Sequence, residues 1–72
     1  MSYDYSKLNG RITEICGSQK VFSQKMNWSE HTTSVKLTGK VPWSQKDIKK
    51  AIDVLGLNDH DIQAYFFTLR VQ

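Results

Sequence analysis

Residues 19–40 read QKVFSQKMNWSEHTTSVKLTGK, and this stretch decides the fold. Phe22 and Met26 lie four residues apart, which is the spacing of one face of a helix. Ser23 follows Phe22, and its small side chain leaves room for a second helix to cross closely. We therefore expect a short helix that Ser18 caps and that ends near Met26.

A second helix is expected to follow after a tight turn. Ser29 can cap it, and Gly39 can end it just after residue 38. Thr33 and Leu37 share its inner face. Thr33 is unusual there, because its hydroxyl can bond to the preceding turn but contributes less apolar burial than an aliphatic side chain. Two short helices joined by a tight turn form the helix-turn-helix unit.

The rest of the chain predicts further short helices and an extended tail. Helices are expected to begin after Asp4, Ser44 and Asn58, whose side chains can cap them, and to end near Cys16, Leu55 and Phe66. In the helix after Ser44, Asp47 stands at the third position and can complete the cap, and Gly56 ends the helix. In the tail, residues 67–72 alternate apolar and polar side chains, which is the period of a strand. The predicted fold is one all-α helix-turn-helix domain over residues 1–72, with four to five short helices. Its expected core is Leu8, Ile12, Ile15, Phe22, Met26, Leu37, Ile48, Ile52, Leu55 and Ile62.

Size and composition restrict the class of protein. The chain has 72 residues, and 39% of them are hydrophobic, which is enough for one compact core. No apolar run approaches the roughly 18 residues that a membrane span needs, and no secretion signal is recognisable. Cys16 is the single cysteine, so it cannot form an intrachain disulfide. We expect a cytoplasmic protein, in which Cys16 is a small core residue.

Positive charge is concentrated around the helix-turn-helix. Residues 7–50 hold nine Lys and Arg against three acidic residues, a net charge of +6, while the other residues sum to −3. Such a distribution is typical of a surface that faces phosphates, although many small domains carry a solvated lysine-rich face.

Catalysis is not expected. His31 and His60 are the only histidines, and they fall on different predicted helices. With one cysteine there is no metal-ligand cluster, and no phosphate loop or nucleophile motif is present. Asp59 and Asp61 are explained by the positive end of a helix. We expect no cofactor, no metal and no small-molecule substrate.

The candidate site is the outer face of the second helix of the unit, where DNA-binding versions read the major groove. Ser18, Gln19 and Lys40 flank this helix as candidate phosphate contacts. Val41 and Trp43 are candidates for an exposed apolar patch beside it. The outward residues are Glu30, His31, Thr32, Ser34, Val35 and Thr38.

This helix offers no Arg, Lys, Asn or Gln near its N-terminal end, where such side chains would read guanine or adenine. Glu30 also brings negative charge toward phosphates. Three interpretations follow: a weak or unusual DNA reader, a face turned toward another protein, or a domain used only for packing. We expect weak DNA binding by the chain alone.

Several motifs resemble one protein family. They are Asp4-Tyr-Ser-Lys-Leu, Gly17-Ser-Gln-Lys, Ser29-Glu, Lys36-Leu, Gly39-Lys-Val-Pro-Trp and Tyr65-Phe-Phe-Thr. Together they are similar to small Cro-like proteins of temperate phages and prophages of Gram-positive bacteria. Length and sequence also resemble the modulator-of-repression proteins of lactococcal temperate phages.

The resemblance implies a role in the choice between lysis and lysogeny, in opposition to the phage repressor. For Cro-like members it implies binding to operator DNA. For modulators it implies binding to the repressor itself. Because Glu30 disfavours simple operator reading, the repressor is the expected partner, and operator DNA is the alternative.

Overall fold

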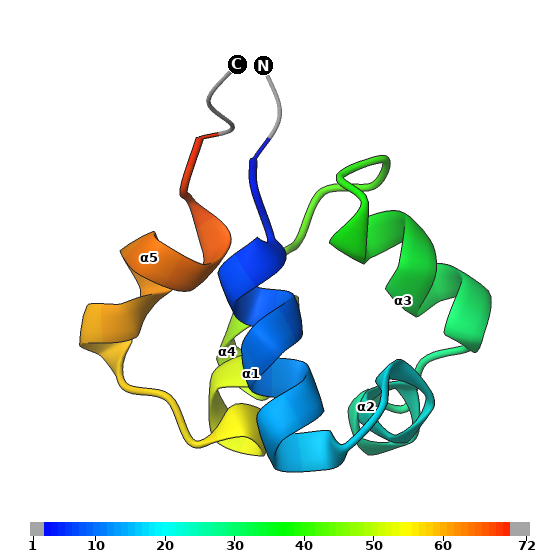
Figure 1. Cartoon of the computed structure of the whole chain (residues 1–72). Coiled ribbons are helices and arrows are strands. Elements are labelled where there is room, and N and C mark those ends of the chain that lie inside the picture. The colour runs from blue at the N-terminus through cyan, green and yellow to red at the C-terminus, as the bar shows by residue number, and fades with distance from the viewer. Residues whose placement is uncertain (1–2, 70–72) are drawn as a thin grey trace.

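The computed structural model describes residues 3–69, which form five α-helices and one short 3-10 helix (Figure 1). This confirms the predicted all-α class. The elements are α1 (Ser6–Cys16), α2 (Gln19–Met26), α3 (Glu30–Leu37), α4 (Gln45–Leu55), η1 (Asp59–Asp61) and α5 (Ile62–Phe66).

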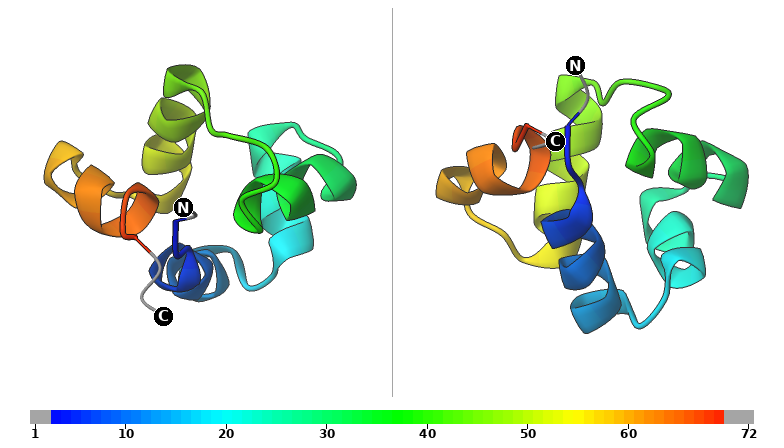
Figure 2. Two further views of the ribbon diagram at one scale, coloured as in Figure 1. Left: turned by 90° about the horizontal axis from the view of Figure 1, so that it is seen from above. Right: turned by 45° about the horizontal axis from the view of Figure 1, so that its top comes forward.

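The helices α1 and α4 pack together at the centre of the molecule, with α5 on one side and the α2–α3 pair on the other (Figure 2). Both central helices also contact α2, whereas α3 packs mainly on α2. The outer position of α3 leaves one of its faces uncovered.

Serine caps begin three helices where the sequence predicts them. Ser18 accepts a hydrogen bond from the backbone N–H of Val21 at 3.2 Å, and Ser29 accepts one from Thr32 at 3.0 Å. Ser44 accepts from Asp47 at 3.1 Å, and the Asp47 carboxylate accepts from the Ser44 N–H in return. Each cap satisfies an amide at the helix start that has no partner within the helix.

The ends of α2 and α4 depend on left-handed backbone. Asn27, with φ of 60°, ends α2, and Gly56, with φ of 65°, ends α4. Asparagine and glycine tolerate this conformation better than other residues do. The Lys50 ammonium of α4 also donates to the carbonyl oxygen of Met26 at 3.0 Å, which satisfies one carbonyl at the end of α2.

Two helix starts differ from the prediction. Helix α1 begins at Ser6 rather than directly after Asp4, because the Asp4 carboxylate accepts the Ser6 N–H at 2.8 Å and holds the chain in a turn there. The last helix is also divided. Asp61 accepts the Asn58 N–H at 3.0 Å, and residues 59–61 form a 3-10 turn before α5 begins.

The buried core contains seven of the ten predicted residues, and Ile48 and Ile62 are partly buried against it. The prediction for Ile15 is wrong, since this side chain is 43% exposed. Cys16 packs against the core instead, as predicted for it. Cys16 lies four residues after Ile12, the same spacing as Leu8 to Ile12, so it continues their stripe as Ile15 does not. The core also includes Tyr5, Ala51 and Phe66, which the prediction lacked.

The start of the predicted extended tail pairs with the N-terminal segment. The Asp4 N–H donates to the carbonyl oxygen of Thr68 at 2.6 Å, and Tyr3 and Leu69 form an isolated antiparallel bridge. Residues 70–72 of the tail lie outside the described residues. Over residues 3–69, the helices are too short and too polar for any of them to cross a membrane.

Candidate functional site

The N-terminal half of α3 is fixed to α2 by a buried pair of hydroxyl groups. The Ser23 hydroxyl donates to the Thr33 hydroxyl at 2.6 Å, and the Thr33 hydroxyl donates to the carbonyl oxygen of Ser29 at 3.1 Å. Both side chains are buried. The predicted bond of Thr33 to its preceding turn is therefore confirmed, and the small Ser23 does lie where the two helices cross.

The C-terminal half of α3 is fixed to α4 by Lys36. Its ammonium forms a salt bridge with Asp47 and lies 4.8 Å from the centre of the Trp28 ring. Its carbonyl oxygen accepts the indole N–H of Trp43 at 3.0 Å. Lys36 thus contacts α4, the turn before α3 and the connector after it, and we call these contacts the Lys36 clamp.

Asp47 is ionised within this clamp. Burial alone would raise the pKa of Asp47, but hydrogen bonds from Lys36 and Ser44, together with the charge of Lys36, outweigh burial. The pKa of Asp47 therefore lies below its usual value. The carboxylate stays charged at neutral pH and serves two purposes, since it pairs with Lys36 and completes the cap of α4.

The six outward residues predicted on α3 all retain solvent exposure. Glu30, His31 and Thr38 are exposed, whereas Thr32, Ser34 and Val35 are partly exposed. The Thr32 hydroxyl accepts a hydrogen bond from Ser29 at 2.9 Å, and the Thr38 hydroxyl donates to the Val35 carbonyl oxygen at 3.3 Å. Glu30 and His31 therefore present the polar groups that are best placed to meet a partner.

An apolar patch adjoins this face at the end of α3. The N–H groups of Lys40 and Val41 both donate to the carbonyl oxygen of Val35, at 2.9 and 3.2 Å. These bonds fold the connector back over the last turn of α3. Val41 is 39% exposed and lies close to Val35, so the two valines can form the apolar centre of a contact.

Trp43 has a different environment from Val41. It is partly buried against the core, and its ring contacts those of Trp28 at 5.3 Å and Phe66 at 5.2 Å between centroids. These contacts and its bond to Lys36 make Trp43 a support for the connector. The predicted apolar interface then depends mainly on Val35 and Val41.

The predicted flanking residues differ in how much of each side chain can reach a partner. Ser18 uses its hydroxyl oxygen to cap α2. Gln19 and Lys40 are exposed. The structure leaves the roles of all three as predictions.

Part of the basic charge is used inside the molecule, which sequence reasoning missed. Lys36 and Lys50 bond to Asp47 and to the Met26 carbonyl oxygen, as described above. Arg11 pairs with Glu14 and donates to the carbonyl oxygen of Leu55 at 3.1 Å, and Lys7 lies over the ring of Tyr65. Five of the nine cations in residues 7–50 remain exposed without such a contact in the described chain, namely Lys20, Lys25, Lys40, Lys46 and Lys49.

The Lys36 clamp was also missed. The sequence indicates Asp47 as a capping residue at the third helical position, but eleven residues separate it from Lys36, and no local pattern joins them. No group of three metal-binding side chains occurs among residues 3–69.

Comparisons with known proteins agree with this architecture. The chain is similar to the modulator of repression (MOR) of the temperate bacteriophage TP901-1 from Lactococcus lactis, whose solution structure is known. The identity is 53%, the TM-score is 0.84, and the likeness covers 100% of this chain and 97% of that one. A comparison with curated proteins gives no match. Residues 1–69 match a family described as "Protein of unknown function (DUF739)", and the chain therefore belongs to that family.

Proposed function

We propose that this chain is an antirepressor of a temperate phage, which binds the DNA-binding domain of the phage repressor and so favours lysis over lysogeny. The observation that carries the proposal is the full-length likeness, at 53% identity, to a modulator of repression. In this proposal the protein is not an enzyme, acts in the cytoplasm of the bacterial host and needs no cofactor.

The charge of α3 supports a protein partner. A repressor must present positive charge to the phosphates of its operator, so an exposed carboxylate at the start of α3 would attract that surface and repel DNA. Glu30 is such a carboxylate, and Val35 and Val41 supply apolar area beside it. His31, Thr32, Ser34 and Thr38 would surround this centre.

A direct block is the simplest mechanism. If α3 covers the groups of the repressor that hold phosphates, the repressor cannot bind its operator while the complex persists. No conformational change in the repressor is needed, because both partners compete for one surface.

The test is the substitution Glu30→Lys. It places a positive charge against a positive surface, so it should weaken binding of the full-length repressor at least tenfold, or about 1.4 kcal/mol. Binding to operator DNA should stay equal or become stronger. Calorimetric titration with the repressor and gel-shift assays with operator DNA measure the two effects.

The matched control is Glu14→Lys, which makes the same change of charge at an exposed position on α1. It should change repressor binding less than twofold. If Glu30→Lys and Val35→Asp both leave the complex unchanged, α3 is not the interface.

A second candidate function is Cro-like binding to operator DNA. It is favoured by the five exposed lysines and by the short turn between α2 and α3, which a helix-turn-helix would require. Ser18, Gln19 and Lys40 would then contact phosphates.

A further inference from the structure

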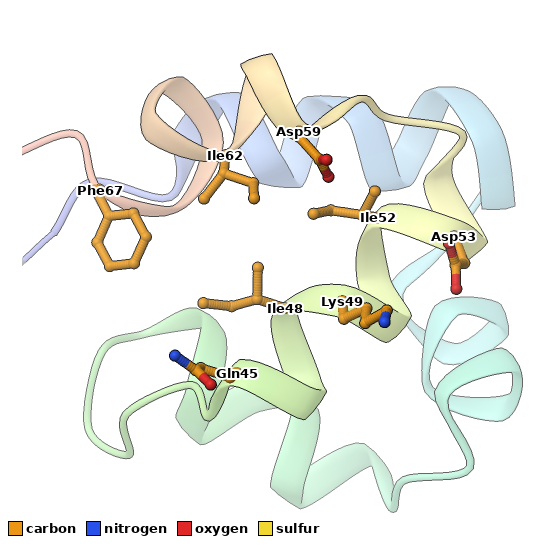
Figure 3. A pocket seen from close by; sticks show the side chains of 8 residues that line it. All are labelled: Gln45, Ile48, Lys49, Ile52, Asp53, Asp59, Ile62 and Phe67. Carbon is orange, nitrogen blue, oxygen red and sulfur yellow. The ribbon is translucent and has the colours of Figure 1, made fainter.

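A groove of about 480 Å³ lies on the other side of α4 from α3 (Figure 3). Ile48 and Ile52 of α4 form one wall, and Ile62 and Phe67 form the other. Ile48 and Ile62 are partly buried, and Phe67 is 36% exposed. The groove therefore presents aliphatic and aromatic surface to solvent, which is the surface that protein partners cover.

Charge is distributed unevenly along this groove. Asp53 of α4 and Asp59 of η1 lie at one end, with Lys49 nearby, whereas Gln45 and Phe67 lie at the uncharged end (Figure 3). Neither carboxylate forms a salt bridge within residues 3–69. Two carboxylates against one ammonium give this end a net negative charge, so it fits a Lys or Arg of a partner.

The length of the groove limits what it can hold. Gln45 and Asp53 are eight residues apart on α4, or about 12 Å along the helix axis. That distance matches two turns of a helix. An amphipathic helix could place two aliphatic side chains, one turn apart, between the walls, and a basic residue beside Asp53 and Asp59.

The groove also continues toward the proposed α3 interface. A second hollow of about 320 Å³ shares Ile48 and Phe67 with it and extends to Gly39 and Pro42, in the connector that carries Val41. Ile48 and Phe67 therefore border both hollows, and the second hollow reaches the connector that joins α3 to α4.

The shape of the groove argues against a second copy of this chain. In a symmetric dimer centred on the groove, the same concave surface would face itself across the two-fold axis, and neither copy would fill the groove of the other. The groove needs a convex partner instead.

We propose that the groove binds a short amphipathic helix of the same repressor that docks on α3. This inference rests on the proposed function. This helix carries two aliphatic residues one turn apart and a Lys or Arg at the end that faces Asp53 and Asp59. The repressor would then be held at two adjoining surfaces, and its release would require both contacts to break.

The experiment is a calorimetric titration of the full-length repressor with groove variants. Asp59→Lys reverses the charge at the acidic end of the groove. Phe67→Ser removes an apolar side chain from the wall of the groove and changes no charge. Each should raise the dissociation constant at least tenfold, whereas Glu14→Lys, outside the groove, should change it less than twofold. Circular dichroism and a melting curve establish that each variant is folded.

The outcomes separate this inference from the proposed function. If Glu30→Lys weakens the complex but Asp59→Lys and Phe67→Ser bind like the wild type, the groove is not occupied and only this inference fails. If the wild-type chain forms no complex with the repressor, the proposed function fails, and this inference fails with it. If the wild type sediments as a dimer and Asp59→Lys as a monomer, a second copy fills the groove, which overturns the inference.

Discussion

At the scale of single residues, Thr33 explains why α2 and α3 can cross so closely. An aliphatic residue would supply more apolar area, but Thr33 bonds to Ser23 of α2 and to the carbonyl oxygen of Ser29. The bond to the carbonyl oxygen of Ser29 could be predicted from the sequence, because it lies within one turn of the chain. The bond to Ser23 could not be predicted, because the partner lies ten residues away on another helix.

This pair leads to a prediction about stability. Thr33→Val keeps the shape of the side chain and removes only its hydroxyl group. Ser23 can still donate to the carbonyl oxygen of Gln19, which lies 2.9 Å away, so no buried donor loses its last partner. The free energy of unfolding should therefore fall by only about 1 kcal/mol. Urea unfolding measures it.

Ser23→Val is the contrasting variant. It replaces the hydroxyl group by a methyl group and adds a second methyl group at the same crossing, and crowding there should cost about 1–3 kcal/mol. Equal stability of Thr33→Val and the wild type would mean that the buried hydroxyl pair contributes nothing. Equal stability of Ser23→Val and the wild type would mean that the crossing is not tight.

At the scale of elements, α3 depends on contacts outside itself. It has eight residues, and of these only Thr33 and Leu37 are buried. A helix of this length is not stable alone in water, so its position must come from its cap, the Ser23 contact and the Lys36 clamp. A surface that is fixed in this way binds a partner more tightly, because less conformational entropy is lost when the complex forms.

The clamp predicts a dependence of stability on pH. The pKa of Asp47 is lower in the folded chain than in the unfolded one, so its contribution is complete above the unfolded pKa near 4. It is lost as the pH falls through the lower, folded value. At pH 7, Asp47→Asn should reduce the free energy of unfolding by roughly 1–3 kcal/mol, because Lys36 loses its charged partner.

The measurement compares urea unfolding of the wild type and Asp47→Asn at pH 7 and at pH 3. Other carboxylates titrate in both proteins, so the difference between the two isolates Asp47. The difference should shrink at pH 3. A gap of the same size at both pH values would show that the charge of Asp47 does not stabilise the clamp.

The elements themselves were largely predictable. Caps and stops act within a few residues, so Ser18, Ser29, Ser44 and Gly56 mark helix ends correctly. The start of α1 could not be predicted, because a carboxylate can cap a helix or hold a turn with the same hydrogen bond. Asp4 does the second.

At the scale of the whole molecule, prediction from sequence becomes weaker. The core brings together Tyr5 and Phe66 from opposite ends of the chain. Each continues a local helical spacing, Tyr5 with Leu8 and Phe66 with Ile62, but no local spacing indicates that the two lie in one core. The groove beside α4 is likewise formed by Ile48 and Ile62, which local spacing assigned simply to the core. Such features follow from how helices pack, and the sequence carries no local signal for them.

Net charge is also a property of the whole molecule, and the fold determines how many of the charged groups remain available to a partner. The sequence indicates a strongly basic half, but four of its nine cations contact groups within the chain. Within residues 7–50, five exposed lysines without such contacts remain against the exposed carboxylate of Glu30, and the exposed Asp53 and Asp59 add negative charge elsewhere on the surface. Any binding to DNA should therefore be weak and should depend on salt.

The DNA-binding alternative can be tested through that salt dependence. If Lys40 contacts a phosphate, Lys40→Ala should reduce the slope of log affinity against log salt by about 1, because one fewer counterion is released on binding. Lys7→Ala removes the same charge from α1, where Lys7 lies over Tyr65, and should leave the slope unchanged. Fluorescence anisotropy with operator DNA over a range of salt concentrations gives both slopes. An affinity that does not change with salt would exclude operator binding through these lysines, and α3 would then remain a surface for the repressor alone.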